Sequence, residues 1–206
     1  MDRAQVAGAI LLGGASSRFG SDKALAKAGD GLLGQRVVAA LRGGGLDPVV
    51  AVGGTAGSAL GLVTLADAEP LGGPLPAVAQ TLSYFGRGHV LVCPCDLPLL
   101  SAQHVAMLIN ALHRLDGDGP PTAVVAEVDG RPQPSLGIWP TSWALAARRA
   151  VVDGRRAFRD ALQLGPWIPV EVPPEALADA DTPETLEELM RITDVGPAGV
   201  PAVDLD

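Results

Sequence analysis

Residues 6–23 read Val-Ala-Gly-Ala-Ile-Leu-Leu-Gly-Gly-Ala-Ser-Ser-Arg-Phe-Gly-Ser-Asp-Lys, and this stretch points to both a fold and a site. Its apolar part, residues 6–12, is typical of a buried strand. Three glycines, Arg18 and Lys23 follow in one loop. Glycines let a backbone approach a ligand closely, and the two cations can balance phosphate charge. We therefore interpret the loop as a polyphosphate site; the alternative is a plain strand-to-helix loop whose basic residues are solvated.

Two common phosphate-binding patterns are absent from this loop. No Gly-Lys-Ser/Thr ends it, which argues against Walker-type chemistry. It also lacks the Gly-x-Gly-x-x-Gly spacing of dinucleotide-binding turns. A polyphosphate site of a different class is therefore expected.

The bulk composition sets further bounds. A chain of 206 residues with 48% hydrophobic residues suits one domain with a sizeable core, which must be aliphatic because only 3% of residues are aromatic. A net charge of −8 argues against a broad nucleic-acid surface. We see neither a signal peptide nor an apolar run of about 20 residues, so a cytoplasmic location off the membrane is expected. Cys93 and Cys95 are expected to be buried and free, since one residue between them is too close for an ordinary disulfide.

Apolar strand-like runs alternate with helix-like segments along the chain. Strands are predicted at residues 6–12, 48–52, 61–66, 89–93, 122–128, 134–139 and 168–172. Helices are predicted at residues 34–42, 74–85, 101–115, 141–152, 155–164 and 182–192. This alternation predicts an α/β fold: a single three-layer, Rossmann-like domain with a mostly parallel sheet and helices on both faces. The domain is expected over residues 1–193, with a tail at 194–206 that is rich in Gly and Pro.

The loops after Leu12, Ala66 and Cys93 should gather at the carboxyl edge of such a sheet, where ligands bind. Asp96 leaves a predicted buried strand in the run Cys-Pro-Cys-Asp-Leu-Pro, and an aspartate there can hold a hard cation such as Mg²⁺. The alternative is a turn-capping role. Asp181 precedes Thr-Pro at a predicted helix start and could likewise be only a cap.

Residues 11–23 also resemble a known family signature. Molybdenum cofactor guanylyltransferases of the MobA type, in the nucleotidyltransferase superfamily, carry the loop Leu-x-Gly-Gly-x-Ser-x-Arg-x-Gly-x-Asp-Lys. Every fixed position of that pattern is present here. The resemblance extends from residue 6 to about residue 192, with further matching motifs at residues 67–75, 96–98 and 181–183.

The resemblance implies roles for individual residues. It implies a nucleotide site at Leu11, Leu12, Gly13, Gly14, Lys23, Asp67 and Asp96, with Asp67 contacting the guanine. Arg18, Lys23 and Asp96 would be catalytic. Asp96 would hold the cofactor Mg²⁺, with Asp181 as a second ligand and Asp179 as a weaker candidate. Acceptor binding would fall to Arg131, Gln133, Arg155 and Arg156, although a solvated basic helix face explains the arginines equally well.

The implied reaction transfers GMP from GTP to the phosphate of Mo-molybdopterin and releases pyrophosphate. Other proteins of cofactor biosynthesis or molybdoenzymes would be partners of a monomer or weak oligomer. Two other readings stay open: transfer of CMP to the same pterin, or nucleotide transfer to another phosphorylated acceptor. A non-catalytic nucleotide-binding domain is a third reading, against which the joint presence of Lys23 and Asp96 argues.

Overall fold

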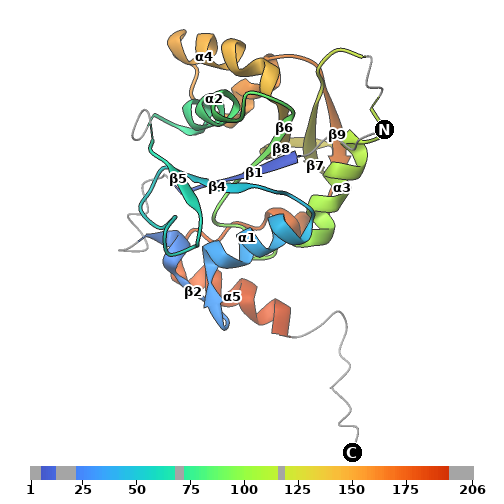
Figure 1. The fold of residues 1–206 in the computed structure, drawn as a ribbon. Helices are drawn as coiled ribbons and strands as arrows, with labels where there is room; N and C mark the ends of the chain where they lie inside the picture. Colours follow the sequence, from blue (N-terminus) through green and yellow to red (C-terminus); the bar gives the residue numbers. More distant parts are fainter. Residues whose placement is uncertain (1–5, 13–21, 68–71, 116–118, 195–206) are drawn as a thin grey trace, which may run out of the picture.

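The computed structural model describes residues 6–12, 22–67, 72–115 and 119–194, and a seven-stranded sheet forms its centre (Figure 1). The strand order is β5-β4-β1-β6-β8-β7-β9. The strands are β1 (Val6–Leu11), β4 (Val49–Val52), β5 (Val63–Leu65), β6 (His89–Pro94), β7 (Ala123–Val128), β8 (Arg131–Pro140) and β9 (Trp167–Glu171). Neighbours pair in parallel except at β8, which is antiparallel to both β6 and β7. The predicted, mostly parallel sheet is confirmed.

β1 lies between β4 and β6, and all six of its residues are buried. A strand covered on both faces needs an uninterrupted apolar run, and the sequence of β1 supplies one. Its side chains alternate between two cores: Ile10 joins one cluster, whereas Ala9 and Leu11 join the other. The sheet therefore separates two apolar layers.

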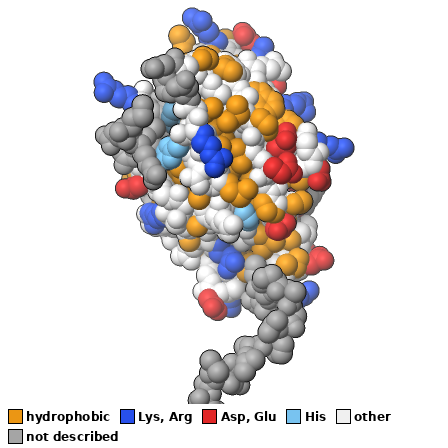
Figure 2. Space-filling view, turned by 90° about the vertical axis from the view of Figure 1, so that its right-hand side faces the viewer, with side chains coloured by type: hydrophobic (Ala, Val, Ile, Leu, Met, Phe, Trp, Pro, Cys, Tyr) orange, Lys and Arg blue, Asp and Glu red, His pale blue; other side chains and the backbone are white. Residues whose placement is uncertain are grey.

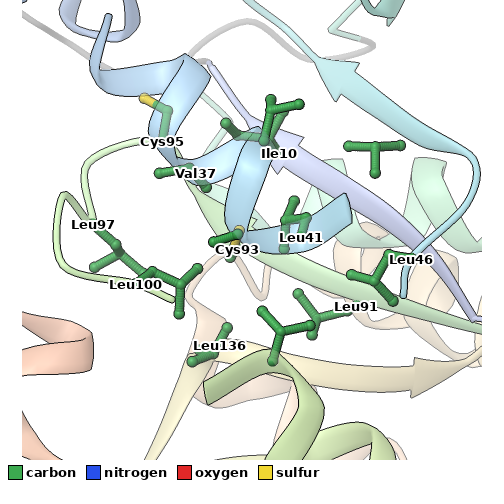
Figure 3. Close-up of a cluster of buried hydrophobic side chains, with 14 of the residues drawn as sticks. Ile10, Val37, Leu41, Leu46, Leu91, Cys93, Cys95, Leu97, Leu100 and Leu136 are labelled. Carbon is green, nitrogen blue, oxygen red and sulfur yellow. The ribbon is translucent and has the colours of Figure 1, made fainter. Parts of the chain in front are cut away.

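Helices cover both faces of the sheet. α1 (Leu33–Gly43) and α3 (Ala102–Leu112) pack on the face of Ile10, and α2 (Pro74–Phe85) and α4 (Ala144–Val152) pack on the other. Figure 3 shows the first core, in which Val37 and Leu41 of α1 meet Ile10 and Leu91 of the sheet. The predicted three-layer arrangement is confirmed.

The last helix, α5 (Pro183–Asp194), stands apart from these layers. It packs against a small hairpin formed by β2 (Lys27–Ala28) and β3 (Gly31–Leu32), near the lower end of the molecule in Figure 1. A separate apolar cluster joins them, made of Ala28, Leu33, Ala180, Leu186 and Met190. The C-terminal helix thus lies beside the segment that contains Lys23.

Several local predictions hold and others need correction. The helix predicted to start at residue 101 is confirmed, and Ser101 caps α3 by accepting a hydrogen bond from the His104 N–H at 3.4 Å. The helix predicted over residues 155–164 is wrong: the structure has only a 3₁₀ helix at Phe158–Gln163. Gly154 has φ of 87°, which ends α4, and the Asp160 carboxylate accepts from the N–H groups of Arg156 and Ala157. These bonds favour a tight capped turn over a continuous helix.

Other differences concern element ends. The predicted helix 141–152 begins as a 3₁₀ turn at Thr141–Trp143 before α4, and the hairpin of β2 and β3 was not predicted. Cys93 and Cys95 are buried and free, as predicted. The expected boundary at residue 193 stays a prediction; α5 ends at Asp194.

The edge strand β9 belongs to the face shown in Figure 2, where hydrophobic side chains lie among charged ones. Pro169 sits in the middle of this strand and is exposed. A proline has no N–H to offer, so β9 is a poor template for a further strand. Within the described residues, no helix has both the length and the apolar character needed to cross a bilayer.

Candidate active site

Asp96 lies just beyond β6, at the carboxyl edge of the sheet. Two hydrogen bonds from distant segments hold its loop. The Ala180 N–H donates to the Asp96 carbonyl oxygen at 2.9 Å, and Arg36 Nε of α1 donates to the Pro98 carbonyl oxygen at 3.3 Å. The Asp96 side chain is 22% exposed, so it is sheltered but reachable from solvent. The loop therefore presents a carboxylate in a defined place.

Lys23 opens a short 3₁₀ helix, Lys23–Leu25, and its position depends on the residue before it. The Asp22 carboxylate accepts a hydrogen bond from the Ala24 N–H at 3.1 Å, and the Asp22 carbonyl accepts from the Leu25 N–H at 2.9 Å. This cap sets the direction in which the lysine side chain leaves the backbone. The Lys23 side chain is only 11% exposed.

Asp181 reaches the same place from the C-terminal segment. Thr182 directly precedes α5 and its hydroxyl accepts from the Thr185 N–H at 3.2 Å, and Asp181 lies just before Thr182. The Asp181 side chain is 56% exposed. Asp179, the weaker candidate, is also exposed, but Asp181 is the residue that meets Lys23.

The three predicted charged residues converge on one point. Lys23 Nζ lies 2.8 Å from Asp96 Oδ2 and 2.9 Å from Asp181 Oδ1. Burial by itself lowers the pKa of Lys23, but its hydrogen bonds to Asp96 and Asp181 and their negative charges outweigh burial and hold that pKa above its usual value. Lys23 is therefore an ammonium at neutral pH.

The donor set suits a hard divalent cation. Asp96 and Asp181 direct one carboxylate oxygen each toward a shared positive charge. Mg²⁺ is commonly held by one or two carboxylates, with substrate phosphates and water completing its shell. Among the described residues there is no group of three or more His, Cys, Asp or Glu that could enclose a metal alone. The arrangement matches a cation site that a phosphate ligand completes.

The rest of the predicted nucleotide site lies along the same edge, as far as the structure describes it. Leu11 and Leu12 are buried at the end of β1, where the Leu12 N–H donates to the Val52 carbonyl at 2.9 Å. Asp67 follows β5 and is half-buried. Because β1, β5 and β6 run in the same direction, their carboxyl ends share one edge. Gly13, Gly14 and Arg18 lie outside the described residues.

The predicted acceptor residues fall in two groups. Arg131 and Gln133 begin β8, beyond the point where β8 pairs with β6, and so lie at the carboxyl edge. Arg155 and Arg156 follow α4. The Arg156 guanidinium donates to the carbonyls of Val151 and Arg155, so it helps to close the end of α4. Acceptor binding by these residues stays a prediction.

The contact between Arg156 and the start of α2 was not predicted from the sequence. The Arg156 carbonyl accepts from the Leu75 N–H at 3.0 Å, and a Cβ at Gly73 would lie 2.7 Å from that carbonyl oxygen. The supporting roles of Asp22, Arg36 and Ala180 were missed as well. Of these, only Asp22 carried a local signal, because Asp is a preferred residue just before a helical turn.

Comparison with known proteins shows the family to which this chain is related. The profile of the MobA-like NTP transferase domain matches residues 8–166, a segment that contains Lys23 and Asp96 and ends before Asp181. A molybdenum cofactor guanylyltransferase from Rhizobium leguminosarum bv. trifolii is 32% identical over 167 residues, covering 78% of this chain and 76% of the relative. A probable molybdenum cofactor guanylyltransferase from Opitutus terrae is 31% identical over 159 residues, covering 75% and 76%.

Solved structures show the same fold. Molybdopterin-guanine dinucleotide biosynthesis protein A from Archaeoglobus fulgidus aligns with a TM-score of 0.68 at 20% identity, covering 91% of this chain and 98% of the other. A nucleotidyl transferase from Methanothermobacter thermautotroptrophicus aligns with a TM-score of 0.70 at 15% identity, covering 92% and 96%. The fold is thus that of the nucleotidyltransferases. Within this class, the chain belongs to the family of MobA-like NTP transferase domains.

Proposed function

We propose that this protein transfers GMP from GTP to the terminal phosphate of Mo-molybdopterin, releasing pyrophosphate and forming the guanine dinucleotide of the cofactor. The observation that carries the proposal is the convergence of Lys23, Asp96 and Asp181 at the carboxyl edge of the sheet. Family membership and the names of the curated relatives support the same reaction.

The reaction forms a bond between an oxygen of the pterin phosphate and the α-phosphorus of GTP. The bond between the α-phosphorus and the oxygen that bridges it to the β-phosphorus breaks. Pyrophosphate leaves with this oxygen and the electron pair of the bond. A phosphate nucleophile is already ionised at neutral pH, so the step needs no general base. The enzyme's contribution is then positioning and charge neutralisation.

Asp96 and Asp181 would hold Mg²⁺, because their oxygens already meet at one positive charge. When bound, Mg²⁺ supplies neutralisation of the charge on the phosphates. Asp96 is the better placed ligand, since its loop is pinned by Ala180 and Arg36 and its side chain is the more sheltered of the two.

Lys23 would neutralise the triphosphate and the charge that develops on pyrophosphate as it leaves. Its raised pKa keeps the ammonium charged for this task. By family resemblance, Arg18 would share the role, the N–H groups of Gly13 and Gly14 would cradle the phosphates next to Leu11 and Leu12, and Asp67 would accept from the guanine edge. Arg131, Gln133, Arg155 and Arg156 would face the acceptor.

Pyrophosphate release tests the proposal directly. Purified protein is incubated with Mg²⁺, a molybdopterin acceptor proven active with an authentic guanylyltransferase, and GTP, CTP, ATP or UTP in parallel. We expect release with GTP alone. Pyrophosphate release with CTP alone would support the same reaction but show that the nucleotide is not GTP. No release with any of the four nucleotides would overturn the proposed reaction. We also propose that the protein is cytoplasmic, that it is a monomer or a weak oligomer, and that it binds other proteins of cofactor biosynthesis or molybdoenzymes.

A further inference from the structure

Lys23 makes the same contacts that a divalent cation in this site would require. Its ammonium lies 2.8 Å from Asp96 Oδ2 and 2.9 Å from Asp181 Oδ1, and it is largely shielded from solvent. Both carboxylates are therefore already neutralised in part by a charge from the protein itself. A second cation arriving at the same oxygens meets this ammonium at short range.

We propose that Lys23 and a divalent cation compete for Asp96 and Asp181, and that the triphosphate of the nucleotide relieves this competition by drawing the Lys23 ammonium toward itself. The proposal rests on the proposed function, which supplies the metal and the nucleotide. Metal and nucleotide then bind with positive coupling, and Lys23 is the residue that couples them. By linkage, each ligand strengthens the other by the same factor.

A lysine at position 23 is suited to movement of its ammonium from the carboxylates to the triphosphate. The chain has only two lysines, Lys23 and Lys27, whereas its other thirteen basic residues are arginines. A lysine ammonium is a compact point charge on a flexible stem, and it can move between two anionic partners. An arginine would hold a carboxylate through a planar, two-pronged contact and would be released less readily.

Lys27 offers a matched control. It lies four residues further along in β2 and is exposed. Replacing Lys27 by Met removes one positive charge from the same region without removing either carboxylate contact of Lys23. The general effect of net charge on cation binding is thereby separated from the local competition.

Binding of Mn²⁺ alone to the protein without nucleotide gives the first test, with free Mn²⁺ measured by electron paramagnetic resonance. We expect Lys23→Met to bind Mn²⁺ more tightly than the wild type, by about tenfold or more. Lys27→Met should match the wild type within about twofold, because exposed charges are well screened. Adding Asp96→Asn to Lys23→Met should abolish the gain. Equal Mn²⁺ affinity of Lys23→Met and wild type would overturn the competition.

A second test uses the wild-type protein and does not depend on whether a variant folds. Side-chain ammonium resonances of isotope-labelled lysine should give at most two signals, one each for Lys23 and Lys27. Mg²⁺ with a GTP analogue carrying a methylene between its α- and β-phosphorus should shift the Lys23 signal and leave the Lys27 signal in place. A Lys23 signal that stays unchanged at saturation would contradict the proposed movement.

These measurements also separate the failure of the coupling from the failure of the proposed function. If the wild type binds Mn²⁺ in the presence of the analogue and turns over GTP, but Lys23→Met does not bind Mn²⁺ more tightly, only the competition is overturned. If Mn²⁺ does not bind the wild type even with the analogue, the metal site fails, and the competition fails with it.

Discussion

The backbone N–H of Ala180 donates a hydrogen bond to the carbonyl oxygen of Asp96 at 2.9 Å. This bond ties the segment before α5 to the loop after β6, and it brings Asp181 to the same side as Asp96. The C-terminal helix is thus part of the support of the site, and its docking on the hairpin of β2 and β3 affects the placement of one carboxylate.

Replacing Asp96 by Asn tests the role of its negative charge. Asn keeps the size of the side chain but removes the charge that pairs with Lys23 and would hold Mg²⁺. A bound metal lowers the barrier by several kcal/mol, so its loss should reduce kcat for pyrophosphate release about 100-fold or more.

The matched control is Asp153→Asn, which changes an exposed aspartate at the end of α4, a helix on the face of the sheet opposite α1. It should retain wild-type kcat. If Asp96→Asn kept activity within about threefold of the wild type, its role in the mechanism would be wrong, since one lost ligand should cost more than one kcal/mol.

The packing of α5 is expected to influence metal binding through Asp181. Leu186 is buried with Ala28, Leu33 and Met190, and Leu186→Ala should destabilise the protein by about 2–4 kcal/mol. Because the loss loosens the helix behind Asp181, the Mg²⁺ concentration for half-maximal activity should rise.

Leu91→Ala in the main core is the comparison for this effect. It should lower the melting temperature at least as much, but leave the Mg²⁺ dependence unchanged. An equal shift in Mg²⁺ dependence for both variants would show that general destabilisation, and not α5, is responsible.

Substitution of Gly73 should destabilise the protein because of its backbone conformation and its close contact with Arg156. It has φ of 90° and ψ of 176°, a region open essentially to glycine, and a Cβ would lie 2.7 Å from the Arg156 carbonyl oxygen. Gly73→Ala should therefore destabilise the protein by about 3 kcal/mol in urea unfolding.

Gly86 ends the same helix with φ of 65°, and a Cβ there would meet nothing within 4 Å. Gly86→Ala should cost only about 1 kcal/mol, the ordinary strain of a left-handed residue. Equal losses at the two positions would mean that the contact with Arg156 contributes nothing.

The two cysteines should be inert in the folded protein. Burial, and to a lesser extent the charge of Asp96, raises the pKa of Cys95 to about 12, and burial raises the pKa of Cys93 further. At pH 8, a disulfide reagent for thiols should label both cysteines in urea and neither in buffer over the same time.

The same pKa shifts predict a loss of stability in base. The folded state keeps both thiols protonated, whereas the unfolded state ionises them above about pH 8.5. The contribution of these thiols to the free energy of unfolding should therefore be constant below that pH and decrease above it. Rapid labelling of the native protein at pH 8 would contradict the burial that underlies both expectations.

The fold could be predicted largely because the strands lie between two layers of helices. Such strands need continuous apolar runs, and those runs alternate with helical segments along the chain. The antiparallel direction of β8 was missed. Asp129 and Gly130, with φ of 51° and 71°, form a tight turn between β7 and β8, and an Asp-Gly turn is a local signal for an antiparallel hairpin. The pairing of β8 with β6 is non-local and leaves no such signal. The missed hairpin of β2 and β3 has strands of two residues, too short for any periodicity.

The residues of the charged cluster were chosen from motifs, but their contacts were not visible in the sequence. Lys23 and Asp181 are 158 positions apart, and the docking of α5 and the bond from Ala180 to Asp96 bring them together. The supporting bond from Arg36 to Pro98 is equally non-local and leaves no sequence signal. Segment 155–164 was mistaken for a helix because the capping by Asp160 competes with helix formation, which periodicity does not reveal.

Transfer of label from GTP is the most direct test of the central claim. The protein is incubated with Mg²⁺, active molybdopterin acceptor and GTP radiolabelled at either the α- or the γ-phosphorus, and the products are separated by chromatography. We predict that the α-label appears in the pterin dinucleotide and the γ-label in pyrophosphate, with both transfers lost in Asp96→Asn. An α-label that never enters the pterin, with an acceptor that an authentic guanylyltransferase converts, would contradict the account.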